Sequence, residues 1–247
     1  KKVNGGPRRP RLTPIAFTKI FVAGYKSFAG EAEIEIRPLT LLAGANSSGK
    51  SSIMQPLLLM KQTLEAPYDP GGLKLDGPHI KLTDVEQMFW HADATEIQAN
   101  ILFGFELSDG LRVELGFVRS PNGDLDVVPR LLTARADTGR AFNLRQEMSS
   151  DEIGEAIGHT IDEPLVWAVE RSRGFLTVTD NGMRIFESPL WMIPGGDDLL
   201  TAIRSVIHLP GLRGYPERSY PVTAIGPTFP GPFDPYTASV LLHWQRQ

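Results

Sequence analysis

The chain has 247 residues, of which 41% are hydrophobic and 22% charged, and its formal net charge is −4 at pH 7. A chain of this length and composition can bury a core, either as one large domain or as two small ones. It contains no cysteine, which excludes disulfides, zinc–thiolate sites and thiol nucleophiles. Its acidic balance excludes a surface that binds nucleic acid as a whole.

The sequence shows neither a membrane-spanning segment nor a signal peptide. No apolar run approaches the roughly 18–20 residues that span a bilayer, and no segment has the layout of a signal peptide. We therefore expect a cytoplasmic protein with no membrane partner. Residues 1–14 are rich in Gly and Pro and predict a flexible tail, with a phosphate-contacting arm as the alternative because of the basic residues Lys1, Lys2, Arg8, Arg9 and Arg11.

Two strands are predicted near the start of the chain, at residues 17–22 and 31–36. The second alternates Ala32, Ile34 and Ile36 with three glutamates, as a half-buried antiparallel strand does. The turn-rich residues 24–30 join them. The pattern predicts an antiparallel pair.

The next stretch, Gly44-Ala45-Asn46-Ser47-Ser48-Gly49-Lys50-Ser51, fits the phosphate-loop pattern G-x-x-x-x-G-K-[ST] without a gap. Its glycines allow a tight turn whose N–H groups point at phosphate oxygens. The lysine can reach the β- and γ-phosphates, and the final serine can provide an oxygen ligand for Mg²⁺. The sequence therefore predicts binding of a nucleoside triphosphate; the alternative is a Gly/Ser-rich turn that caps a helix.

The segments on either side of this loop agree with the first interpretation. Residues 39–43 form a short apolar run that predicts a buried strand. Residues 51–64 carry apolar side chains at helical spacing, at Ile53, Leu57, Met60 and Leu64. Pro56 should bend this helix unless its first turn is irregular. A strand that leads into a helix through a glycine-rich loop is the arrangement that binds phosphate.

The middle of the chain, residues 95–190, predicts an antiparallel β region with one helix. Strands at 97–107 and 111–118 form a hairpin, and 125–134 is a third strand. Residues 146–170 show helical spacing, with Ser149 or Ser150 as the N-cap ahead of Glu152. A second hairpin is predicted around Asp180-Asn181-Gly182.

The last part of the chain predicts two helices, at residues 197–206 and 236–247. A short strand is predicted at 206–209. Residues 211–235 are dense in Pro and Gly and predict an ordered surface loop.

Three blocks of sequence resemble the opening of a known class of ATPase. They are residues 20–28, residues 38–52 around the phosphate loop, and more loosely residues 208–216. The chain is similar to the N-terminal half of a bacterial AAA/ABC-type ATPase of the RecF/SMC/OLD-like class. The resemblance implies an α/β fold: a P-loop NTPase, the ABC-type ATPase head lobe, with antiparallel strands ahead of the phosphate loop and an added antiparallel β region. Residues 15–247 would form the N-terminal lobe of this head, with 95–190 inserted.

The resemblance also implies roles for particular residues. ATP and Mg²⁺ would be the cofactors, bound by a cradle with Ser51 on the metal; its members are Gly44, Asn46, Ser47, Ser48, Gly49, Lys50, Ser51 and Ser52. Lys26 and Ser27 occupy the place where such heads touch nucleotide, with a solvated turn as the alternative. Gln87 and Arg213 are the catalytic candidates between the lobes, with a surface glutamine and an ordinary salt bridge as their alternatives.

Two sequence motifs of this ATPase class are not found in the chain. No run of four apolar residues ends in Asp-Glu, the acidic metal ligand that hydrolysis needs; residues 166–170, in the predicted helix, come nearest. The signature motif that completes a neighbour's site is also absent. We therefore expect the second lobe to lie beyond Gln247 or to be supplied separately.

The leading interpretation is an ATP-binding lobe that dimerises on ATP, as a homodimer or with a partner ATPase head. It would couple hydrolysis to a nucleic-acid-linked or antiphage-defence activity, and an effector nuclease is a candidate partner. A P-loop kinase or phosphotransferase remains as one alternative. Another is a non-catalytic scaffold that keeps the nucleotide-binding fold to carry a partner and has no affinity for nucleotide.

Overall fold

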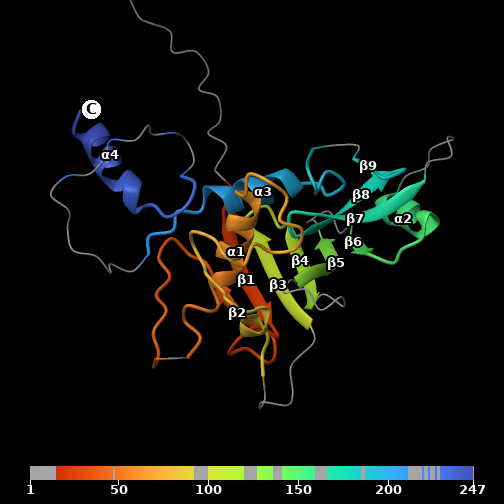
Figure 1. Ribbon diagram of the computed structural model, residues 1–247, viewed down its shortest axis with the longest axis horizontal. Coiled ribbons are helices and arrows are strands. Elements are labelled where there is room, and N and C mark those ends of the chain that lie inside the picture. The colour runs from red at the N-terminus through yellow and green to blue at the C-terminus, as the bar shows by residue number, and fades with distance from the viewer. Residues whose placement is uncertain are drawn as a thin grey trace, which may run out of the picture.

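The computed structural model describes residues 15–46, 48–91, 100–119, 127–135, 141–158, 166–184, 187–210, 219, 222, 226 and 229–246. Within these residues the protein is a mixed α/β structure with a six-stranded and a three-stranded antiparallel sheet (Figure 1). The predicted tail at 1–14 lies outside the described residues, as does most of the predicted loop at 211–235.

The larger sheet is built around β1 (Phe17–Ala23), which pairs with a strand on each side. The order is β2-β1-β3-β4-β5-β6, and every neighbouring pair is antiparallel. Ile20 and Val22 of β1 lie fully inside the core, in one cluster with apolar side chains of α1 and β3. The other strands are β2 (Ala32–Glu35), β3 (Asn100–Leu107), β4 (Arg112–Arg119), β5 (Val127–Arg135) and β6 (Ala141–Arg145).

These strands confirm the predicted antiparallel pair and the predicted hairpin. β1 and β2 pair with Ile20 opposite Ile34, and β3 and β4 turn back at residues 108–111. β5 matches the predicted third strand, whereas β6 carried no clear signal. β3 pairs directly with β1, so the strands from the middle of the chain continue the sheet that the first two strands begin.

Helix α1 (Gln55–Leu64) packs on this sheet through three of the four apolar residues that predicted it, and the fourth, Ile53, lies in the turn before the helix. Ile53, Leu57, Met60 and Leu64 all belong to the buried core that contains the inward side chains of β1 and β3. Burying a side chain of this size stabilises the fold by about 1.5–3 kcal/mol. Figure 1 shows α3 (Gly196–Ser205) beside α1, and the Lys61 ammonium of α1 donates to the Arg204 carbonyl of α3 at 2.7 Å.

The smaller sheet corrects one prediction. Residues 146–170 do not form one helix: α2 (Ser150–Ile157) ends at Gly158, whose φ of 66° is left-handed, and residues 167–172 form strand β7 (Trp167–Ser172). The predicted capping box is confirmed, with Ser149 and Glu152 bonded reciprocally. The helical spacing could not exclude a strand in its second half, where Trp167 and Val169 are typical of strands.

The second predicted hairpin is also confirmed. β8 (Phe175–Asp180) turns through Asn181 and Gly182, with φ values of 48° and 73°, into β9 (Met183–Arg184). Both central residues have positive φ, as an Asn-Gly turn of type I′ requires. The sheet order is β7-β8-β9.

The predicted C-terminal helices are present as α3 and α4 (Asp234–Gln245), but the strand predicted at 206–209 is not formed. These residues belong to neither sheet of the described chain, and Ile207 and Leu209 are exposed. Among the described residues, no helix has both the length and the apolar character needed to cross a membrane.

Candidate functional site

The phosphate-loop sequence lies immediately before α1. After Gly49 the chain enters a tight turn in which the Ile53 N–H donates to the Gly49 carbonyl and the Met54 N–H to the Ser51 carbonyl. The regular helix begins only at Gln55, with Pro56 in its first turn. The helix predicted from Ser51 therefore starts with an irregular turn, and Pro56 sits where its missing N–H costs no helical bond. Ser47 lies outside the described residues.

Four consecutive amides at this turn have no carbonyl partner in the described chain, those of Gly49, Lys50, Ser51 and Ser52. Free N–H groups at the start of a helix carry partial positive charge, which the helix dipole reinforces. Gly49 is buried, Lys50 and Ser52 are half-buried, and Ser51 is exposed. The arrangement can bind an anionic oxygen cluster such as a phosphate.

The Lys50 ammonium bends back over the loop. It donates to the Gly44 carbonyl at 2.8 Å and also to the Ala45 carbonyl. The loop is tight at this point, since a Cβ on Gly44 would come within 2.8 Å of the Ser48 hydroxyl. A cation held on the loop in this way adds positive charge to it, which favours binding of an anion.

The turn between β1 and β2 packs directly against the loop. The Phe28 ring lies so close to Gly49 that an added Cβ would meet its Cζ at 2.8 Å, and Gly49 has a φ of 87°. The Tyr25 hydroxyl donates to the Gln55 side chain at 2.8 Å, and burial raises the pKa of the Tyr25 phenol well above its usual range. These contacts could not be predicted from the sequence, because nothing local to Phe28 or Tyr25 indicates which distant segment they touch.

Lys26 and Ser27 sit in this same turn, which the structure brings beside the loop. The Lys26 amine lies 5.5 Å from the centre of the Tyr25 ring rather than on the loop, and burial lowers its pKa. Its φ of 49° is held by a hydrogen bond from its N–H to the Met88 carbonyl. Ser27 is exposed.

Gln87 lies in a short 3₁₀ helix, η1 (Val85–Met88), which borders the β1–β2 turn. The Lys26 amide bonds to Met88, and the Trp90 amide bonds to Gly24. The Gln87 side chain is exposed, and its amide exchanges hydrogen bonds with Thr83 at 2.9 and 3.3 Å. These are the contacts of a surface glutamine. Arg213, the other catalytic candidate, lies outside the described residues.

The apolar run before the loop is not the buried strand that its sequence predicts. Residues 39–43 form no strand, and Leu39 and Leu41 are 75% and 82% exposed. A strand that is apolar on both faces needs neighbours on both edges and cover on both faces. No described segment of the chain provides them.

The acidic element that sequence brings nearest to the class lies in the smaller sheet. Glu170, the nearest match to the acidic element in sequence, faces Thr177 across the β7–β8 pair, in the smaller sheet. That sheet contacts β5, on the opposite side of the larger sheet from β1 and β2 (Figure 1). Within the described ranges, no three His, Cys, Asp or Glu side chains gather in a way that could hold a metal ion.

No protein-family model matches the chain, and no curated protein matches it.

Proposed function

We propose that this chain is the ATP-binding lobe of an ABC/SMC-like ATPase. It dimerises when ATP binds and couples hydrolysis to a nucleic-acid-linked or antiphage-defence activity. The observation that carries the proposal is the turn at Gly49–Ser52: its sequence fits the phosphate-loop pattern, its four amides have no carbonyl partner in the described chain, and a helix follows it.

The side chains of the loop fit a polyphosphate in part. The amides of residues 49–52 would surround phosphate oxygens, and Lys50 would exchange its bonds with Gly44 and Ala45 for bonds to the β- and γ-phosphates. The exposed Ser51 hydroxyl would be the chain's ligand for Mg²⁺, which supplies neutralisation of phosphate charge when it is bound. Phe28 and Tyr25 hold the β1–β2 turn, with Lys26, next to this cradle.

Two observations support completion of the site by a second lobe. The apolar residues before the loop are exposed, as expected of an inner strand whose neighbours come from another segment or subunit. The described residues also place no carboxylate cluster at Ser51, so the acidic metal ligand and the residue that positions water would come from that lobe.

Calorimetric titration of the chain with ATP and Mg²⁺ tests the proposal. We expect saturable binding that Lys50→Ala weakens by more than tenfold, because the variant loses the charge that faces the phosphates. Lys81→Ala is the matched control, since Lys81 is an exposed lysine on the 76–81 loop. Phosphate release by the chain alone should be close to background; clear turnover would contradict the need for a second lobe.

The engagement of Lys50 by its own loop favours one alternative, a non-catalytic scaffold in which these bonds are permanent. That alternative predicts no heat on titration with ATP. Binding that survives unchanged in Lys50→Ala would argue against both functions.

A further inference from the structure

A hollow lies between α3 and the segment that follows β9, and none of its lining residues belongs to the phosphate loop. Its volume is about 600 Å³, within the range of small-molecule sites. Its floor is apolar, made by the buried side chains of Pro189 and Leu200, and the half-buried Trp191 lies at one end. The indole N–H of Trp191 already donates to the Val178 carbonyl, so the ring offers the hollow only its apolar surface.

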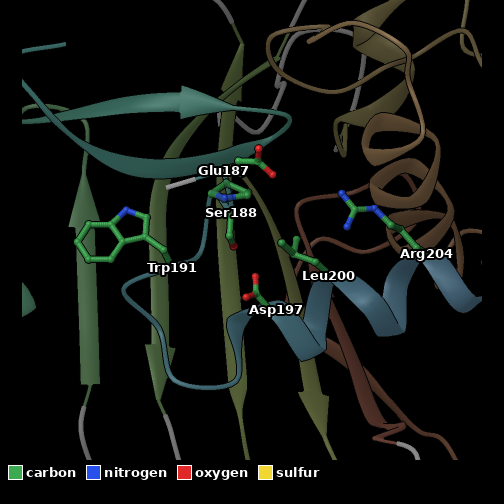
Figure 2. Close-up of a pocket in the computed structure, with 7 residues that line it drawn as sticks. Glu187, Ser188, Trp191, Asp197, Leu200 and Arg204 are labelled. Carbon is green, nitrogen blue, oxygen red and sulfur yellow. The ribbon is translucent and has the colours of Figure 1, made fainter. Parts of the chain in front are cut away.

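Three charged side chains surround this floor. Figure 2 shows Glu187 and Arg204 directed toward one another from opposite sides, with Asp197 below them and Leu200 between. Within the described part of the chain, none of the three side chains forms a hydrogen bond or an ion pair. Asp197 and Arg204 stand in the first and last turns of α3, where they complement the helix dipole, but Glu187 has no such role.

The arrangement of charge selects a particular kind of ligand. The carboxylate of Asp197 lies beside the first turn of α3, with that of Glu187 above it, and the two can bind a cation. The guanidinium at the other end can bind a carboxylate. Asp197 and Arg204 are seven residues apart on α3, which corresponds to roughly 10 Å of helix. A ligand that reaches both ends therefore needs its opposite charges several ångströms apart, joined by an apolar chain that lies on Leu200.

We propose that this hollow binds an extended zwitterion of the ω-amino acid type, with an amine near Glu187 and Asp197 and a carboxylate on Arg204. The methylene chain covers the apolar floor. The site is separate from the phosphate loop and does not depend on nucleotide binding. The backbone at Arg204 is fixed independently of its side chain, since the Arg204 carbonyl accepts a hydrogen bond from Lys61.

The probe that isolates this chemistry is 6-aminohexanoate, compared with hexanoate and hexylamine, which each lack one charge. Binding is measured by NMR through the indole N–H signal of Trp191, one of four tryptophans, assigned with Trp191→Phe. We expect saturable binding of 6-aminohexanoate and at least tenfold weaker binding of the other two. Arg204→Gln and Asp197→Asn should each weaken binding roughly tenfold, because each removes a charged hydrogen-bond partner.

Asp198→Asn is the matched control, because Asp198 is the exposed neighbour of Asp197 in the same turn but does not line the hollow. It should leave binding unchanged. The proposal is overturned by any of three results: no saturable shift, binding of hexanoate or hexylamine as strong as that of 6-aminohexanoate, or equal losses in Asp197→Asn and Asp198→Asn. If Arg204→Gln fails to fold, Glu187→Gln carries the same test at the amine end.

Discussion

Gly49 is the residue at which the phosphate loop tolerates least change. Its φ of 87° is a conformation that other residues adopt only with strain, and an added Cβ would meet the Phe28 ring. We expect Gly49→Ala to lower the free energy of unfolding by about 1–3 kcal/mol. It should also separate the loop from the β1–β2 turn. Urea unfolding measures the first effect, and NMR contacts of the Phe28 ring measure the second.

Gly30 provides the control for this substitution. It lies in the same β1–β2 connection, and a Cβ added to it meets nothing within 4 Å. Gly30→Ala should therefore change stability by no more than about 0.5 kcal/mol. Equal losses in the two variants would mean that backbone entropy, and not the contact with Phe28, determines the cost.

The pattern of residue types predicted some of these roles and missed others. Gly49 and Lys50 could be placed at the loop from sequence, because the motif fixes their spacing within eight residues. Phe28 could not be placed against Gly49, since 21 positions separate them and side-chain contact at that range depends on the whole fold. The same limit hid the bond between Tyr25 and Gln55.

At the scale of elements, α1 shows what apolar spacing can and cannot reveal. The spacing predicted its buried face, but Lys61, Gln62 and Thr63 are buried as well. These three polar side chains bind segments distant in sequence: Lys61 reaches α3, and Gln62 and Thr63 bond to the backbone of residues 74–80. When the polar side chains of a helix form hydrogen bonds to neighbouring loops, those side chains are buried too, and the hydrophobic pattern does not indicate this.

Lys61 provides the test of this interpretation. Its ammonium is fully buried and pairs with Glu65 at 2.5 Å. Burial raises the pKa of Glu65, but His79, Lys61 and the Gly231 amide together bring it below its usual value. Lys61→Met leaves that carboxylate without its closest cation and should cost about 3 kcal/mol in urea unfolding. A loss no larger than that of the exposed Lys81→Met would contradict the assignment.

Capping and turn signals predicted correctly where α2 begins and where β8 turns into β9. Helical spacing without such a signal predicted the wrong element at residues 166–170. The Ser149–Glu152 box begins α2 and the Asn181-Gly182 turn closes β8 onto β9, because both depend on a few adjacent residues. Residues 166–170 were predicted as helix and are part of β7, because pairing with β8 outweighs a helical spacing.

At the scale of the molecule, the sequence predicted a mixed α/β protein with antiparallel strands before the loop. It could not predict that β1 would join those strands to β3 and so to the rest of the larger sheet. Pairing between strands some 80 residues apart follows from the global fold rather than from any local pattern. The exposure of residues 39–43 is the clearest departure, since their sequence is that of an inner strand.

That departure leads to a prediction about the molecule as a whole. Because Leu41 is 82% exposed, Leu41→Lys should change the free energy of unfolding by no more than about 0.5 kcal/mol. By contrast, Leu59→Ala, at a fully buried position of α1, should cost about 2–5 kcal/mol. An exposed apolar segment with free backbone groups also promotes association, so Leu41→Lys should reduce concentration-dependent self-association in sedimentation velocity. If Leu41→Lys destabilises the chain as much as Leu59→Ala does, residues 39–43 pack within this chain and need no second lobe to cover them.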